Sequence, residues 1–162
     1  MEMSSRFFLF KYSSVLLSIF FILINSCGER GDRANNDKSQ RIIRYLDKTT
    51  QTKIPSNVAQ YLIVDFYSCH GCVSMISNNL QDKIDTAHRT TLIFVYPGHT
   101  KPSETIFFQS KKNVIFDNSN FYAKQNISSE PAILITTHNR KIVNTIELTP
   151  ANYHEVLNNT SY

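Results

Sequence analysis

The sequence contains no tryptophan and no dense block of lysine and arginine. Its formal net charge is only +4, from 17 basic against 13 acidic residues. Nucleic-acid binding needs a basic stripe, so the composition gives that class of function little support. The chain has 162 residues, 41% of them hydrophobic, and shows no internal repeat or second domain. It is therefore long enough, and apolar enough, for one domain with a substantial core.

The N-terminal part has the layout of an export signal. Arg6 and Lys11 precede an uncharged apolar run from Tyr12 to Ile24, which is too short for a comfortable membrane-spanning helix. The run ends in Leu-Ile-Asn-Ser-Cys over residues 23–27, which resembles the lipobox of bacterial lipoproteins. That resemblance implies that Cys27 is lipidated and becomes the mature N-terminus.

We therefore expect a lipoprotein signal peptide over residues 1–26, a polar flexible tether over 27–38 and a folded domain over 39–162. An ordinary signal peptide or an uncleaved anchor is the alternative. All of these readings place the domain outside the cytoplasm. The lipobox implies a lipid-anchored protein of the cell envelope, facing the periplasm or the cell exterior.

Cysteine is scarce, with three in the chain. If Cys27 is lipidated, Cys69 and Cys72 must pair with each other or with a partner. A structural disulfide is the simplest interpretation outside the cytoplasm. However, closing a four-residue loop removes unfolded-state entropy worth only about 2 kcal/mol, against about 3 kcal/mol for fifteen residues. The pair is poorly placed as a staple and well placed for thiol–disulfide exchange.

The two cysteines follow an apolar, β-branched and aromatic run, Tyr61–Tyr67, that predicts a buried strand. Apolar residues then recur three or four apart, at Val73, Ile76, Leu80 and Ile84, which predicts a helix over residues 72–84. The unpaired N–H groups and positive end of a helix dipole stabilise a thiolate at this position. We therefore expect a redox-active dithiol where the helix begins.

The rest of the chain alternates between strands and short helices. Near-continuous apolar strands suggest an α/β domain whose sheet is covered on both faces. The expected final helix has Thr149 as N-cap and Pro150 at its first position. The further expected elements are a helix over 39–49, strands over 90–96 and 113–117, helical segments over 103–110 and 118–126, and a hairpin formed by 132–137 and 142–148.

This pattern resembles the thioredoxin fold, in particular the TlpA/ResA-type membrane-anchored thiol–disulfide oxidoreductases. Three motifs within about residues 58–158 carry the resemblance: Val64-Asp65-Phe66 leading into Cys69-His70-Gly71-Cys72, the segment from Val114-Ile115-Phe116-Asp117 to Asn126-Ile127, and Glu130-Pro131-Ala132-Ile133. It implies a central mixed sheet flanked by helices in a single domain. It also implies exchange with disulfides of exported proteins, slightly favouring the reducing direction.

A reductase of this type needs a membrane protein as electron donor and no bound cofactor beyond its disulfide. The resemblance implies that Cys69 is the nucleophile and Cys72 the resolving cysteine. Pro131 would be a cis-proline beside the dithiol, exposing the backbone of Glu130 for pairing with substrate. Asp65 would be a buried proton acceptor for Cys72, or else a solvent-facing aspartate at the strand end.

Two charges are expected to oppose each other at the dithiol. His70, when protonated, would lower the pKa of Cys69, whereas the carboxylate of Glu130 would raise it. The family often has proline inside the motif, where this chain has His70 and Gly71, and Ser68 stands where the family usually has tryptophan. These departures keep open a second hypothesis, a non-catalytic thioredoxin-like binding lipoprotein with a structural disulfide.

Other chemistries find less support. Val73 stands where a haem-attachment motif requires histidine, and no peroxidase-type Pro-x-x-x-Thr-x-x-Cys arrangement precedes Cys69. Zinc or copper would need further ligands near the dithiol, so we expect no metal site. The five histidines are scattered without ligand spacing, at positions 70, 88, 99, 138 and 154.

Overall fold

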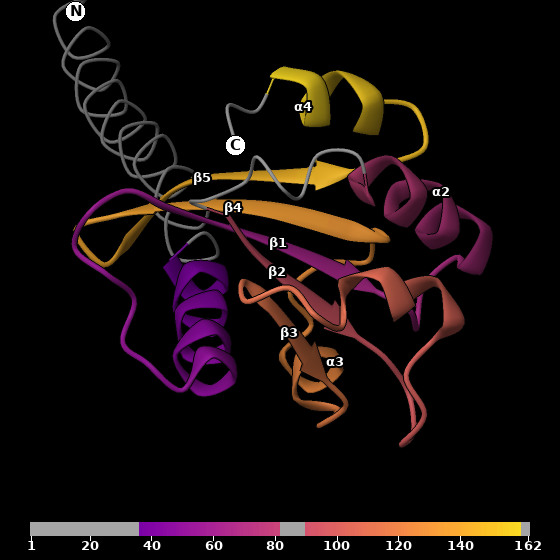
Figure 1. The fold of residues 1–162 in the computed structure, drawn as a ribbon. Helices are drawn as coiled ribbons and strands as arrows, with labels where there is room; N and C mark the ends of the chain where they lie inside the picture. The colour runs from indigo at the N-terminus through magenta and orange to yellow at the C-terminus, as the bar shows by residue number, and fades with distance from the viewer. Residues whose placement is uncertain (1–35, 82–89, 160–162) are drawn as a thin grey trace, which may run out of the picture. The chain divides into compact units, whose positions relative to one another are not determined.

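The computed structural model describes residues 36–81 and 90–159, which contain one five-stranded sheet (Figure 1). Its strands are β1 (Ala59–Asp65), β2 (Thr90–Val95), β3 (Val114–Asp117), β4 (Ala132–His138) and β5 (Lys141–Leu148). They lie in the order β3-β2-β1-β4-β5, with β1, β2 and β3 parallel and β4 antiparallel to both β1 and β5. A central strand that is parallel to the next strand along the chain and antiparallel to a C-terminal hairpin is the thioredoxin-like arrangement, as expected.

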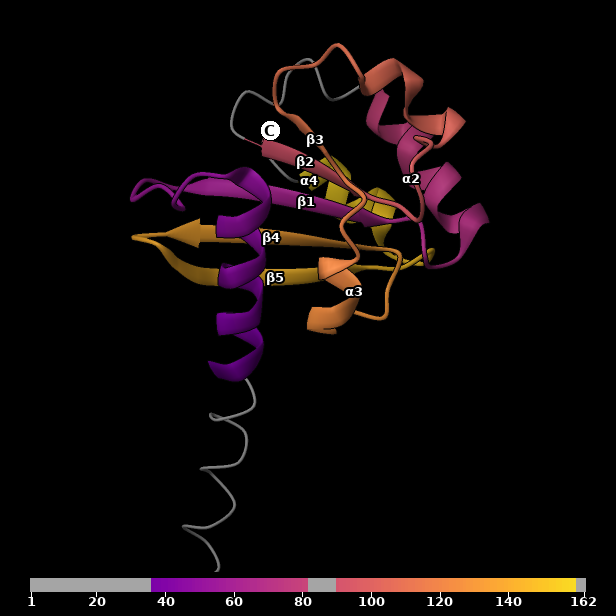
Figure 2. The ribbon, with the colours of Figure 1, turned by 90° about the horizontal axis from the view of Figure 1, so that it is seen from below.

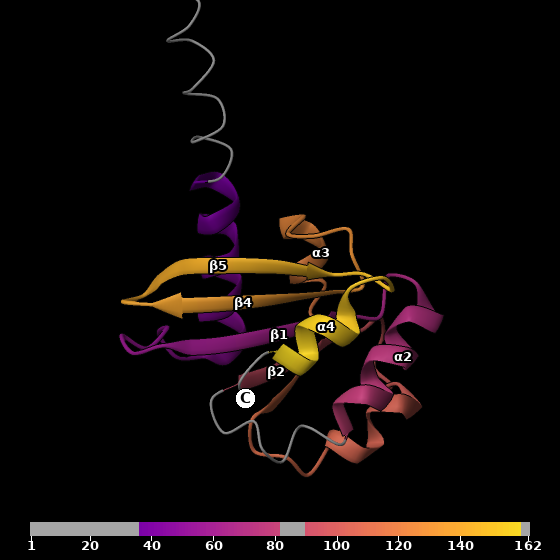
Figure 3. The same ribbon diagram turned by 90° about the horizontal axis from the view of Figure 1, so that it is seen from above.

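Helices cover both faces of this sheet. Residues 36–50 are helical, followed by α2 (His70–Gln81), the 3₁₀ segment η2 (Ser103–Phe108), α3 (Phe121–Gln125) and α4 (Tyr153–Asn159). Figure 2 shows α3 in front of the sheet, whereas the opposite view in Figure 3 shows α4 in front of it. Among the described residues, none of the helices combines the length and apolar character needed to cross a membrane.

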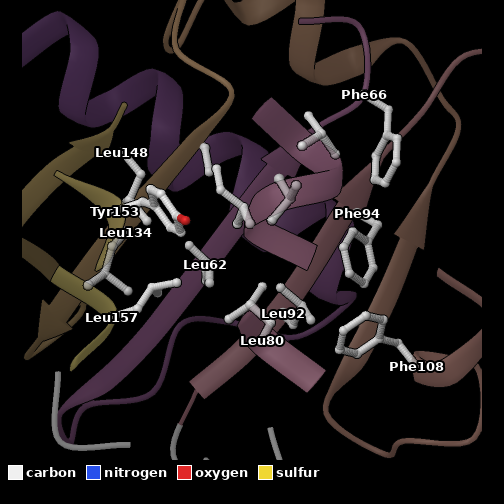
Figure 4. Packing of buried hydrophobic residues seen from close by; sticks show 14 of the residues in the cluster. Leu62, Phe66, Leu80, Leu92, Phe94, Phe108, Leu134, Leu148, Tyr153 and Leu157 are labelled. Atoms are coloured by element: carbon white, nitrogen blue, oxygen red, sulfur yellow. The ribbon is translucent and has the colours of Figure 1, made fainter. Parts of the chain in front are cut away.

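Alternation along β1 divides the core into two clusters. Leu62 and Val64 belong to a first cluster with residues of α2, η2 and α4, shown in Figure 4. Tyr61 and Ile63 belong to a second cluster, on the other face, with residues of the first helix and of α3. Successive side chains of a strand point to opposite faces, so the two clusters lie on opposite sides of the sheet. The expected burial of the sheet on both faces is therefore confirmed.

The helical spacing after the dithiol is also confirmed. Val73, Ile76 and Leu80 are all buried in the first cluster, whereas Ile84 lies outside the described residues. The boundaries differ from those expected. Strand β1 ends at Asp65 rather than Tyr67, because the Asp65 carboxylate accepts the Tyr67 N–H at 2.9 Å and turns the chain.

The final helix begins later than the sequence indicated. The chain begins to turn at Thr149, as expected, because the Thr149 carbonyl accepts the Tyr153 N–H at 3.1 Å, but the regular helix α4 starts only at Tyr153, after a turn over residues 150–152. Within this turn the Asn152 amide oxygen accepts the Thr149 N–H at 2.8 Å, a side-chain interaction that competes with regular helix. The first helix also covers residues 36–50 rather than 39–49, and so includes the last three residues of the expected tether.

Candidate functional site

Cys69 and Cys72 form a disulfide at the junction between β1 and α2, with their Cα atoms 5.3 Å apart. Cys69 occupies the capping position of α2, because its carbonyl accepts the Val73 N–H at 3.0 Å. Its Sγ atom accepts the Cys72 N–H at 3.4 Å. Cys69 is exposed and Cys72 is partly buried, so the first cysteine is the one that another protein can reach.

The electrostatic setting at this helix end suits a thiolate. The first turn of α2 contains no acidic residue, and the Cys72 N–H already points at the Cys69 sulfur. When the disulfide is reduced, the same N–H can donate a charge-assisted hydrogen bond to a Cys69 thiolate. The backbone therefore favours the nucleophilic form of Cys69 without help from a basic side chain.

Asp65 lies under the loop that leads to Cys69 and is only 7% exposed, so the solvent-facing alternative is wrong. Its carboxylate accepts the Tyr67 N–H at 2.9 Å and the Ser68 hydroxyl at 3.3 Å. Burial raises the pKa of Asp65, while these two hydrogen bonds partly counteract the rise. Ser68, in the position where the resemblance leads us to expect tryptophan, thus connects the buried carboxylate to the residue before the nucleophile.

Pro131 lies beside the end of β1. Its carbonyl accepts the Asp65 N–H at 2.9 Å, which extends the pairing of β1 with β4 by one position beyond Val64 and Ala132. The expected cis-proline is wrong, since the Glu130–Pro131 peptide bond is trans, the intrinsically favoured isomer by about 0.5–1 kcal/mol. Glu130 is partly buried, and its N–H donates to the Ser128 hydroxyl at 3.1 Å.

The remaining predicted site residues are Cys27, His70 and Gly71. Cys27 and the side chain of His70 lie outside the described residues, so lipidation and the effect of His70 on Cys69 stay predictions. Gly71 is exposed, and a Cβ atom built there would meet nothing within 4 Å among the described residues. The backbone at Gly71 is therefore exposed.

Tyr67 was not singled out by the sequence pattern, although it stands two residues before Cys69. The residue is 40% exposed, and its hydroxyl donates to the Asn120 side-chain oxygen. Asn120 has a left-handed backbone conformation, with φ of 59°, just before α3. Its position two residues before a Cys-x-x-Cys is the sequence signal that could have indicated Tyr67. The contact with Asn120 could not be foreseen, because it joins segments 53 residues apart.

Metal ligands do not gather in the described part of the chain. No group of three or more histidine, cysteine, aspartate or glutamate side chains occurs there in an arrangement that could hold a metal ion. The chemistry that the described site offers by itself is that of its two sulfur atoms, a helix terminus and a buried carboxylate.

Comparisons with known proteins add a fold likeness. No protein-family model and no curated protein matches the sequence. Among solved structures, one described as a "putative Thiol:disulfide interchange protein DsbE" from Chlorobium tepidum is 16% identical, with a TM-score of 0.38. The match covers 68% of this chain and 77% of that one. The fold assignment rests on the strand order and pairing described above.

Proposed function

We propose that this protein is a thiol–disulfide oxidoreductase that acts on disulfides of exported proteins through Cys69 and Cys72. The observation that carries the proposal is the position of Cys69, which is exposed, caps α2 and receives the Cys72 N–H at its sulfur. The thioredoxin-like strand order and the Cys-x-x-Cys disulfide support it. The structural neighbour is described as a putative thiol:disulfide interchange protein, a name that denotes the same class of activity.

The proposed reaction starts from the reduced protein. The Cys69 thiolate attacks one sulfur of a substrate disulfide, a Cys69–substrate disulfide forms, and the other substrate sulfur leaves as a thiolate that takes up a proton. Cys72 then loses its proton and attacks the Cys69 sulfur, which expels the second substrate thiolate. Two electrons pass to the substrate, and the Cys69–Cys72 disulfide remains.

We favour the reducing direction. Asp65 is a buried carboxylate at the end of β1, and the partly buried Glu130 belongs to the segment that pairs beside it. Negative charge near a dithiol disfavours the thiolate, which makes the disulfide harder to reduce and the dithiol a stronger reductant. A membrane protein that carries electrons across the bilayer would regenerate the dithiol, and lipidated Cys27 would hold the domain near it in the cell envelope.

The open surface around the dithiol supports a protein substrate. Cys69 and Gly71 are exposed, and Tyr67 presents a large, partly exposed ring two residues before the nucleophile. An extended substrate segment can therefore approach the backbone at Gly71 while its cysteine meets Cys69. We expect Tyr67 to contribute apolar contact area to this encounter.

The test is turnover of a model protein disulfide by the detergent-solubilised full chain, compared with its Cys69→Ser, Cys72→Ser and Ser68→Ala variants. Cys69→Ser should lose all exchange while remaining folded, and Cys72→Ser should accumulate a mixed disulfide with substrate. Ser68→Ala, which keeps both cysteines but removes one donor from Asp65, should still turn over at neutral pH, with a loss of rate confined to acidic pH because the pKa of Asp65 rises. Absence of exchange by the folded wild-type chain would favour the binding-lipoprotein alternative instead.

The redox direction needs a separate measurement, the reduction potential of the Cys69–Cys72 pair against thiol buffers. A reduction potential of about −270 mV or lower supports a reductant. A reduction potential of about −120 mV would mean that the helix end and His70 stabilise the Cys69 thiolate more than the nearby carboxylates destabilise it, and would contradict the proposed direction.

A further inference from the structure

Two buried carboxylates lie in one row across the sheet. Asp65 of β1 pairs with Val95 of β2, which pairs with Asp117 of β3. Val95 belongs to the second core cluster, so the strand register places both aspartates on that face, one on each side of Val95. Each aspartate is only 7% exposed. Buried carboxylates need hydrogen-bond donors if they are to stay ionised.

Two tyrosines belong to the core cluster on this face. Tyr45 and Tyr122 are both fully buried in it, with ring centroids 5.1 Å apart in an edge-to-face arrangement. The Tyr45 hydroxyl donates to the Asp117 carboxylate at 2.9 Å. The Tyr122 hydroxyl, by contrast, has no hydrogen-bond partner among the described residues, although the side chain is only 1% exposed.

Tyr122 interacts with Asp65 through space. The negative charge of Asp65 raises the pKa of the Tyr122 hydroxyl, second only to burial as a cause. The known contacts of Asp65 use two acceptor sites of a carboxylate that offers about four. A buried hydroxyl without a partner and a buried carboxylate with spare acceptor capacity thus lie on the same face of the sheet.

We propose that Tyr122 is a positioning residue for Asp65, connected to it by one internal water that accepts a hydrogen bond from the Tyr122 hydroxyl and donates one to the carboxylate. Such a water would have two polar partners in an otherwise apolar cluster. By favouring ionised Asp65, the bridge keeps a proton acceptor ready for Cys72 during exchange. This role rests on the proposed function, whereas the bridge itself does not.

The other charged and titratable groups around this face act against ionisation or are engaged elsewhere. Asp117 contributes a like charge, and Glu147 pairs with Ile133 of the second cluster and also acts on Tyr122. The Tyr45 hydroxyl is hydrogen-bonded to Asp117, the Tyr67 hydroxyl to Asn120, and the Arg41 guanidinium to the carbonyls of Gln125 and Asn126. Among the described residues of this face, Tyr122 has a buried hydroxyl without a hydrogen-bond partner.

The test uses the full chain in its oxidised form, in which the carboxyl pKa of Asp65 is followed by carbon NMR. In Tyr122→Phe the ring packing is kept and the donor is lost, so the pKa of Asp65 should rise by about one unit. The matched control is Tyr45→Phe, which removes an equally buried hydroxyl from Asp117 and should move the pKa of Asp65 by less than a third as much. An unchanged or lower value in Tyr122→Phe, or equal shifts in both variants, would overturn the proposal.

This titration needs no redox turnover, so it separates failure of the bridge from failure of the proposed function. In wild type the Tyr122 hydroxyl proton should exchange slowly and show cross-relaxation to a bound water. Lack of that signal overturns the bridge even if the variant does not fold. For the catalytic role, the acid limb of the pH profile of disulfide reduction should shift upward in Tyr122→Phe as far as the pKa of Asp65 does. A profile that stays fixed while that pKa moves would refute the role in exchange.

Discussion

Reduction of the Cys69–Cys72 disulfide should lower the free energy of unfolding only slightly. The two cysteines close a four-residue loop at the start of a helix, so the crosslink removes unfolded-state entropy worth about 2 kcal/mol. The reduced form regains part of this, because a Cys69 thiolate that caps α2 is stabilised by about 0.3–1 kcal/mol. The net difference should be about 1–2 kcal/mol in favour of the oxidised protein.

Thermal and urea unfolding of the oxidised and reduced full chain would measure this difference. A domain of this length loses about 4 °C of melting temperature per kcal/mol, so reduction should lower Tm by about 4–8 °C. Through the thermodynamic cycle, folding should lower the reduction potential of the pair by only about 20–45 mV relative to the unfolded chain. The Cys69→Ala/Cys72→Ala variant, which lacks both the disulfide and the thiolate, should be slightly less stable than the reduced protein.

One result would refute this reasoning. If reduction destabilised the fold by more than about 4 kcal/mol, the disulfide would be a structural staple of the kind found in small secreted domains. The non-catalytic alternative would then gain support. A reduced protein that remains folded, with near-native stability, is what a dithiol that cycles between two redox states requires.

Three further predictions concern single side chains. Asp65→Asn should stabilise the protein at neutral pH, and the gain should vanish at acidic pH. Folding raises the pKa of Asp65, so the protein loses stability as the pH rises from the ordinary pKa of the carboxyl, which holds in the unfolded chain, through its raised pKa in the folded protein. Urea unfolding at several pH values can measure this loss. Gly71→Ala should raise stability by about 0.5–1 kcal/mol, because a Cβ there meets nothing within 4 Å among the described residues and the position is helical; slower turnover of protein disulfides in this variant would show that substrate needs the bare backbone. Tyr45→Phe should cost about 1.5–3 kcal/mol, because it removes the hydroxyl that donates to the buried Asp117 Oδ2, while the Ser119 N–H still donates to Oδ1. A double-mutant cycle with Asp117→Asn should recover most of that value.

Several features of the fold were predictable because they depend on local sequence. The apolar runs of β1 and β2 indicated strands buried on both faces, and the spacing of Val73, Ile76 and Leu80 indicated the buried side of α2. The hairpin between β4 and β5 was also expected from a short polar connection. It closes through Asn139 and Arg140, with φ of 51° and 60°.

Local side-chain hydrogen bonds moved some boundaries. The carboxylate of Asp65 ends β1 early by accepting a backbone N–H two residues ahead, and the Asn152 amide delays α4. Asn and Asp side chains compete with regular secondary structure for backbone donors. The outcome of that competition depends on whether the side chain is buried, which periodicity alone does not reveal.

The amino-acid sequence by itself determined that two cysteines stand where a buried strand gives way to a helix. The tertiary structure decided what surrounds them. Asp65 is a buried carboxylate at a strand end whose backbone pairs with Pro131, 66 residues away, and Tyr45 meets Asp117 across 72 residues. Tyr122 faces the same row because α3 packs on that side of the sheet. Periodicity and motif spacing report only neighbours along the chain, whereas these contacts exist because the strand order β3-β2-β1-β4-β5 brings distant segments to one end of the sheet.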